Sequence, residues 1–195
     1  MEQDRTRELE ADRRLIDAVM RGDPDAVASW YAREHPRVFR LALGFLACPE
    51  DAEDMAQDAM LHLMDHLHRW NGKTPFRGFR NAVVTNLCRD RLRRKAVRKR
   101  AEDEAATALE KRSPLPDPAA AVDQQELRSL FASALRKVPP REREVFVLRD
   151  LEEVSTSEVA ETLGIRPASV RSLLSLARSR LRKILASRLP ESPRP

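Results

Sequence analysis

Glycine, tyrosine and cysteine are scarce in this sequence. Its 195 residues include five glycines, one tyrosine and two cysteines, and aromatic residues make up only 5%. Glycine supplies the backbone conformations that turns, β-bulges and phosphate-binding loops require. Its scarcity therefore argues against a β-sandwich, a β-barrel or a glycine-rich nucleotide-binding fold. The two cysteines, Cys48 and Cys88, have neither disulfide nor metal-site spacing, so we expect reduced, buried thiols.

Long apolar runs are also missing. No stretch approaches the ~20 apolar residues that a membrane-spanning helix needs. The stretch from Met1 to Glu10 is charged, which a secretion signal is not. We therefore expect a cytoplasmic protein without direct membrane insertion.

Charged residues, by contrast, are abundant. They make up 34% of the chain, and 36 Lys and Arg against 31 Asp and Glu give a net charge of +5. Alanine, leucine, arginine and glutamate dominate, and these residues favour helices. The composition predicts an all-α fold.

The charges are distributed unevenly along the chain. Between Leu41 and His68 there are six acidic residues and neither Lys nor Arg. Between Arg69 and Arg100 there are twelve basic residues and one acid, Asp90, which gives that segment a net charge of +11. Such a density of positive charge is typical of a site for a polyanion. We favour nucleic acid as its partner over a helix face that is merely solvated.

Helix signals recur along the first hundred residues. Asp23 before Pro24 and Thr74 before Pro75 are typical N-caps, and acids open a further helix at residue 50. We expect helices at 9–20, 24–34 and 36–47, another from 49, and a long one from 75 to 100, with residues 1–8 frayed and a loop at 70–73.

The two helices of opposite charge each have a predicted buried face. In the acidic helix it consists of Ala52, Met55, Ala56, Ala59, Met60, Leu63 and Leu67, and the opposite face carries Glu53, Asp54, Gln57, Asp58, Leu61 and Asp65. In the basic helix it consists of Phe76, Phe79, Val83 and Leu87.

Residues 101–123 interrupt the helical pattern. They contain three prolines and six acids, which predicts a flexible linker. We therefore divide the chain into a first helical domain at 1–100, an acidic linker at 101–123 and a second helical domain at 124–195.

The second domain contains a helix-turn-helix candidate. We expect helices at 124–137 and 141–150, then a short helix opened by a capping box of Ser155 and Glu158 and stopped by Gly164. Pro167 starts the last helix. Its apolar stripe includes Val170, Leu174 and Leu181, and its opposite face carries small hydroxyl residues and arginines, which favours DNA over a generic helical hairpin.

Two composite motifs stand out within these helices. The first comprises residues 51–61 (DAEDMAQDAML), 70–72 (WNG), 76–79 (FRGF) and 86–94 (NLCRDRLRR). The second comprises residues 138–148 (VPPREREVFVL), 159–165 (VAETLGI) and 169–172 (SVRS). In this order they resemble conserved regions 2 and 4 of the sigma-70 family of bacterial RNA polymerase sigma factors, and specifically its small extracytoplasmic-function (ECF) group.

The resemblance implies a function and its partners. A sigma factor binds core RNA polymerase, directs it to promoters by recognising −10 and −35 elements, and helps to open the DNA. The resemblance also implies promoter DNA and an anti-sigma factor as partners. It implies that the chain performs no catalysis and needs no cofactor, metal or small-molecule substrate. The core-binding residues by this resemblance are Asp54, Gln57, Asp58 and Leu61.

The resemblance also assigns two DNA-binding sets. For the −10 element they are Trp70, Asn71, Lys73, Arg77, Arg80, Asn86, Arg91, Arg93 and Arg94. Aromatic platforms beside cations are what single strands require. For the −35 element they are Arg166, Ala168, Ser169, Arg171, Ser172, Ser175 and Arg178. Arg166 and Leu173 replace a serine and an arginine that are frequent in the family, which favours phosphate contacts over direct base readout at −35.

Two other classes of function are open at this point. A stand-alone DNA-binding regulator would use the same helix-turn-helix, bind duplex DNA without polymerase and usually dimerise. An enzyme such as a nuclease would need a metal-ligand cluster. His62, His66 and His68 are close in sequence, but we interpret them as surface or interface residues.

Overall fold

The computed structural model describes residues 2–105 and 131–186, which are helical and contain no strand, as the composition predicts. The N-terminal half (residues 2–105) contains α1 (Glu2–Met20), α2 (Pro24–Leu46), α3 (Pro49–Asp65), the 3₁₀ turn η1 (Leu67–Arg69) and α4 (Phe76–Ala105). The C-terminal half (131–186) begins with a helical segment at 131–136. It continues with α6 (Pro140–Phe146), the π-helical segment η2 (Val147–Leu151), α7 (Thr156–Leu163) and α8 (Pro167–Ala186).

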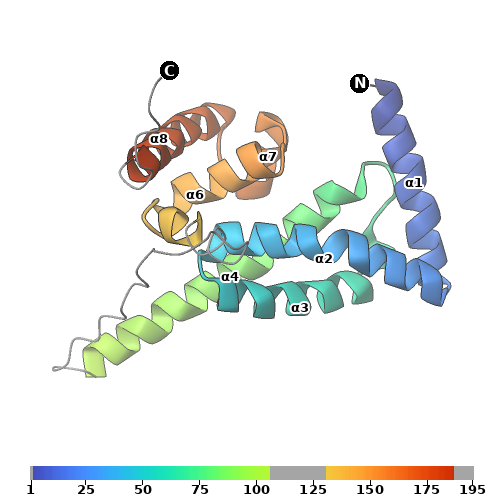
Figure 1. The fold of residues 1–195 in the computed structure, drawn as a ribbon, viewed down its shortest axis with the longest axis horizontal. Coiled ribbons are helices and arrows are strands. Elements are labelled where there is room, and N and C mark those ends of the chain that lie inside the picture. The colour runs from blue at the N-terminus through green and yellow to red at the C-terminus, as the bar shows by residue number, and fades with distance from the viewer. Residues whose placement is uncertain (1, 106–130, 187–195) are drawn as a thin grey trace, which may run out of the picture.

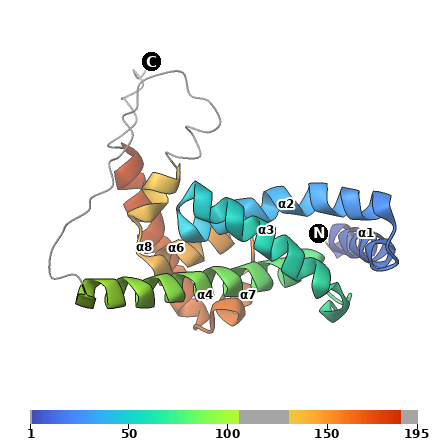
Figure 2. The ribbon, with the colours of Figure 1, turned by 90° about the horizontal axis from the view of Figure 1, so that it is seen from below.

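The helices are arranged around α2 (Figure 1). Helix α3 runs back along α2, and α4 passes beneath both of them, with its last turns extending beyond the bundle (Figure 2). Helix α1 lies at the N-terminal end of α2. Helices α6, α7 and α8 lie together over its C-terminal end, so that α2 connects the two halves of the molecule.

Helix α2 corrects one prediction. The sequence predicts two helices, at 24–34 and 36–47, because proline removes a backbone donor. The structure instead has one helix with Pro36 inside it. Pro36 and Ala32 are both exposed, so the carbonyl that loses its partner is on the water side. Trp30, before Pro36, and Val38, after it, are both fully buried, so the helix packs against the same core on either side of the proline.

Helix α3 confirms the predicted pattern in full. All seven residues of the predicted apolar stripe are at most 4% exposed, Leu67 being in η1. The six residues predicted for the opposite face are all exposed. Its charge and its buried stripe therefore lie on separate sides.

Two helix boundaries differ from those expected. Helix α1 begins at Glu2, so the expectation of a frayed segment is wrong for residues 2–8, which are rich in helix-favouring side chains. Helix α4 continues to Ala105, into the predicted linker. The rest of that linker, and the beginning of the helix expected at 124–137, lie outside the described residues.

The helix-turn-helix is formed as expected. The Ser155 hydroxyl accepts a hydrogen bond from the Glu158 amide at 3.3 Å, and the Glu158 carboxylate accepts one from the Ser155 amide at 3.0 Å. Gly164 ends α7 with φ = 64°, a left-handed conformation that suits glycine. Val170, Leu174, Ala177 and Leu181 are the buried residues of α8.

The two halves share one core. Val147 of η2 is fully buried, and its methyl groups press on Gly44 of α2. The Arg136 guanidinium donates to the carbonyl of Ala47, at the end of α2, at 3.1 and 3.2 Å. Ala47 itself packs among apolar side chains of the C-terminal half. Close approach of the backbone of α2 to Val147 therefore requires glycine at position 44.

A pair of glycine substitutions tests this contact. A Cβ atom at Gly44 would lie 2.6 and 2.7 Å from the two Val147 methyl carbons, whereas one at Gly78 in α4 would meet nothing within 4 Å. We expect Gly78→Ala to stabilise the protein by about 0.5–1 kcal/mol through helix propensity. Gly44→Ala should lower stability instead, because valine is stiff about χ1 and cannot move aside. Urea unfolding measures both. An equal gain for the two variants would contradict the contact.

Candidate functional site

The outer side of α3 forms an acidic face, which we define as Asp54, Gln57, Asp58 and Leu61. All four residues are exposed. Leu61 is 69% exposed and lies near the end of α3. An exposed leucine among carboxylates fits a docking surface that buries an apolar centre within a charged rim.

The inner edge of α3 is tied to α4 by ion pairs. Asp51 accepts hydrogen bonds from Arg91 and Lys95, both at 2.9 Å, and Asp54 lies 3.4 Å from Arg91. The Arg91 hydrogen bond, followed by that of Lys95, lowers the pKa of Asp51. Arg91 therefore connects the acidic and the basic helix in this arrangement.

The loop between η1 and α4, residues 70–75, has a defined shape. The Trp70 indole donates to the Thr74 carbonyl at 3.0 Å, and the Lys73 amide donates to the Asn71 side chain at 2.9 Å. The Trp70 ring is half-buried and meets the Phe76 ring edge-on, with 5.7 Å between centroids. Asn71 and Lys73 are exposed. The loop thus offers an aromatic ring, an amide and a cation at one place.

The buried face of α4 differs from the predicted one. Phe76 is 1% exposed as expected, but Phe79, Val83 and Leu87 are only half-buried. The buried residues are instead one or two positions further on: Arg80, Asn81, Val84, Thr85 and Cys88. The prediction chose the stripe by apolar residues alone and therefore passed over Arg80.

Arg80 is enclosed by carboxylates. Its guanidinium donates to Glu34 of α2 at 3.0 Å and to Glu152, which follows η2, at 2.8 Å. The three side chains are 4%, 1% and 6% exposed. Burial raises the pKa of Glu152, against the opposing effect of Arg80. In this arrangement Arg80 cannot contact a DNA strand, so its assignment to the −10 set is corrected for the conformation described here.

A second arginine of α4 is also held by the C-terminal half. Arg89 donates to Glu144 of α6 at 2.8 Å, and the Glu144 side chain is 8% exposed. Glu144 and Glu152 therefore both bring acidic groups of the C-terminal half onto the basic helix.

Other polar residues of α4 are open to solvent. Arg93 pairs with Asp90, one turn earlier on the same helix, at 3.0 Å, and its side chain is 75% exposed. Asn86, Arg94 and Arg98 are exposed as well, while Arg77 is half-buried. This exposed basic surface lies on the same helix as Arg80 and Arg89, the two arginines that are paired with Glu152 and Glu144.

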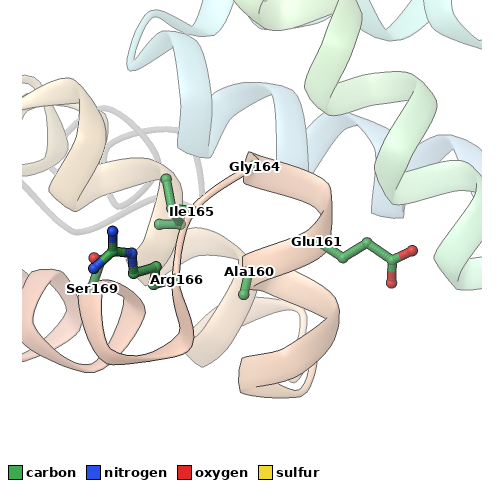
Figure 3. A pocket seen from close by; sticks show the side chains of 6 residues that line it. All are labelled: Ala160, Glu161, Gly164, Ile165, Arg166 and Ser169. Atoms are coloured by element: carbon green, nitrogen blue, oxygen red, sulfur yellow. The ribbon is translucent and has the colours of Figure 1, made fainter.

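An open surface hollow of about 540 Å³ lies at the turn of the helix-turn-helix. Figure 3 shows its lining by Ala160, Glu161, Gly164, Ile165, Arg166 and Ser169. Arg166 and Ser169 lie together on one side, and Glu161 points away from them. The start of α8 thus has a basic rim.

The outer face of α8 is accessible. Ala168, Ser169, Arg171, Ser172 and Ser175 are all exposed. Arg178 is exposed too, but Asp150 of η2 holds it in a two-pronged ion pair at 2.6 and 2.7 Å, which raises the pKa of Arg178. Arg171 is therefore better placed than Arg178 to bind a phosphate.

The His62 and His66 rings stack with 4.1 Å between centroids. Within residues 2–105 and 131–186, no three His, Cys, Asp or Glu side chains gather as metal ligands would. None of the helices in those ranges combines the length and the apolar character needed to cross a membrane.

Two segments of the chain match regions of one known protein family. Residues 30–98 match the family description "Sigma-70 region 2", and residues 128–181 match "Sigma-70, region 4". SigE of Mycolicibacterium smegmatis, an ECF RNA polymerase sigma factor, is 33% identical over 88% of this chain and 67% of its own length. SigM of Mycobacterium tuberculosis, also an ECF sigma factor, is 30% identical over 90% of this chain and 85% of its own.

The chain belongs to the ECF group of sigma-70 family sigma factors. Sigma factors of this family direct promoter-specific transcription initiation by RNA polymerase. The fold agrees with a solved sigma factor, RpoE of Bartonella quintana in complex with the anti-sigma factor NepR, at a TM-score of 0.63, with 18% identity over 83% of this chain and 98% of that one.

The family regions cover most, but not all, of the site of this sigma factor. Region 2 contains the acidic face, the 70–75 loop and the basic part of α4, and region 4 contains the helix-turn-helix. Helix α1 precedes both regions, yet its Arg13 contacts Gly72 of the 70–75 loop and its Asp12 contacts Phe76, the first residue of α4.

Sequence reasoning missed four acidic residues that shape this site: Asp12, Glu34, Glu144 and Glu152. A signal existed for one of them. Glu34 continues the stripe of Ala26, Trp30 and Val38 at four-residue spacing, so a charge falls on a buried line. Arg80 falls in the same way between Phe76 and Val84 on α4. Each interruption places a charge on a buried line, but the spacing does not say which residues pair.

Proposed function

We propose a division of labour for this sigma factor. The acidic face of α3 binds core RNA polymerase. The 70–75 loop and the exposed bases of α4 bind the −10 element as its strands separate, and the start of α8 binds the −35 element. The chain performs no catalysis itself, and an anti-sigma factor regulates it.

The observation that carries the proposal is the opposed charge of two neighbouring helices. The acidic face presents carboxylates with an exposed leucine, while the exposed side of α4 presents Arg93, Arg94 and Arg98. A protein partner and a nucleic acid can therefore be held on different sides of one small bundle. The aromatic ring and cations of the 70–75 loop are suited to an unpaired base.

Reconstitution tests the proposal. Purified protein is added to core polymerase, and transcription is measured from promoters found by mapping transcription starts after overexpression. Stable association with core and start-site-specific transcripts are expected. Failure to associate with core would refute the proposal.

A gel-shift assay with and without core polymerase separates the proposal from the alternative of a stand-alone regulator. The helix-turn-helix is the observation that supports that alternative. A stand-alone regulator shifts duplex DNA by itself, whereas a sigma factor of this kind does so only with core. Metal-dependent cleavage of the DNA in the same assay would indicate a nuclease.

The exposed arginines of α4 give a salt-dependence prediction. Arg93→Ala with Arg94→Ala removes two cations that lie open to solvent. Each phosphate contact contributes roughly one unit to the slope of log K against log salt concentration, so the slope of open-complex formation should fall by about two. Arg91→Ala, which breaks the pairs with Asp51 and Asp54, should change the slope less. An unchanged slope in the double variant would contradict the −10 assignment of these two residues.

A further inference from the structure

Helix α1 contacts the 70–75 loop directly. The Arg13 Nε atom donates a hydrogen bond of 2.6 Å to the carbonyl of Gly72, 59 residues away in sequence. Gly72 has φ = 64°, and a Cβ atom there would lie 3.3 Å from the same Arg13 nitrogen. Glycine therefore serves both the left-handed turn and the close approach of the arginine.

The residue next to Arg13 fixes the other end of the loop. The Asp12 carboxylate accepts a hydrogen bond of 2.7 Å from the Phe76 amide, at the first residue of α4. Asp12 is 5% exposed, and Arg33 of α2 lies 3.0 Å from its second oxygen. An acid from another helix thus acts as the N-terminal cap of α4.

The two contacts bracket the loop that holds the candidate base-binding residues. Between Gly72 and Phe76 lie only Lys73, Thr74 and Pro75, and the Trp70 indole is bonded to the Thr74 carbonyl. Moving the Gly72 carbonyl or the Phe76 amide would therefore move Trp70 and Lys73. Single-strand capture depends on stacking and on cation placement, and both depend on this geometry.

We propose that Asp12 and Arg13 are positioning residues for capture of the −10 strand. They hold the 70–75 loop in the shape that receives an unpaired base, without touching the base. This inference rests on the proposed function of the loop, and it extends the −10 site to a helix that neither matched family region includes.

The first test needs only the free protein. Trp30 is fully buried and Trp70 is half-buried, so acrylamide quenching of tryptophan fluorescence reports mainly on Trp70. Arg13→Ala should raise the quenching constant, and Arg13→Lys should restore part of it because the ammonium can still donate to the carbonyl. Arg14→Ala, at the exposed neighbouring arginine, is the matched control and should behave as wild type.

The second test uses holoenzyme on a mapped promoter. Arg13→Ala should lower open-complex formation about tenfold, as expected for loss of one charged hydrogen bond. Its affinity for core polymerase should be unchanged, and Arg13→Lys should recover activity. If Arg13→Ala and Arg14→Ala are equal in both tests, or if Arg13→Lys recovers nothing, the positioning role is overturned. If the wild-type chain opens no promoter, the proposed function itself fails, whatever the quenching test gives.

Discussion

Replacing Arg80 by alanine is expected to lower the free energy of unfolding by about 3–5 kcal/mol, because it breaks a buried ion pair by removing one partner, although Glu34 keeps its contacts with Arg33 and Arg37. Glu34 would lose its contact with Arg80 at 3.0 Å and Glu152 its contact at 2.8 Å. Both carboxylates are nearly inaccessible to water, so solvent cannot replace the guanidinium. Urea unfolding of the full chain measures the loss.

The control for this prediction is on the same helix. Arg98→Ala removes an exposed arginine and should change stability by less than about 0.5 kcal/mol. The two variants also separate the two roles considered for Arg80. An Arg80→Ala protein with wild-type stability but defective promoter opening would favour the DNA contact implied by the family resemblance, and the buried role would then be wrong.

Replacing Asp58 by arginine is expected to weaken binding to core polymerase at least about 100-fold, or roughly 3 kcal/mol. Charge complementarity means that an acidic face is matched by a basic one on the partner. The substitution removes an attraction and adds a repulsion beside Leu61, the exposed apolar residue of that face. Stability should not change, because Asp58 is exposed.

Fluorescence anisotropy of labelled protein with core polymerase measures this affinity. Asp17→Arg is the matched control, since it makes the same charge change at an exposed position on α1. Leu61→Ala should weaken binding as well, without altering net charge. Equal affinities for Asp58→Arg and Asp17→Arg would show that the docking surface lies elsewhere.

The contrast between α3 and α4 shows what the sequence could predict. In α3 the apolar and charged residues occupy separate sides, and every predicted position of its stripe is buried. In α4 the buried side includes Arg80, Asn81 and Thr85, so apolar spacing alone selects the wrong neighbours. A buried arginine is stabilised by carboxylates that lie far away in sequence, 46 and 72 residues from Arg80. Local periodicity contains no information about such partners.

The same limit applies to the candidate site. Composition and charge order identified the acidic and basic helices, and local rules identified the capping box and the glycine stop of the helix-turn-helix. The sequence did not show which arginines are free to bind a ligand, because that depends on ion pairs with residues distant in sequence. Arg93 and Arg94 are exposed, whereas Arg91 is bonded to Asp51 and Arg178 to Asp150.

The charges linking the two halves alternate in sign along a chain of contacts: Asp12, Arg33, Glu34, Arg80 and Glu152. The first four belong to the N-terminal half and are already neutral as a group, with two charges of each sign. If Glu152 moves away, Arg80 still pairs with Glu34, so no unpaired ion remains inside the N-terminal half, and the Glu152 carboxylate becomes exposed to water. The ion network alone would therefore stay balanced in the N-terminal half, whereas separating the halves would also expose the shared apolar core around Val147 and Gly44.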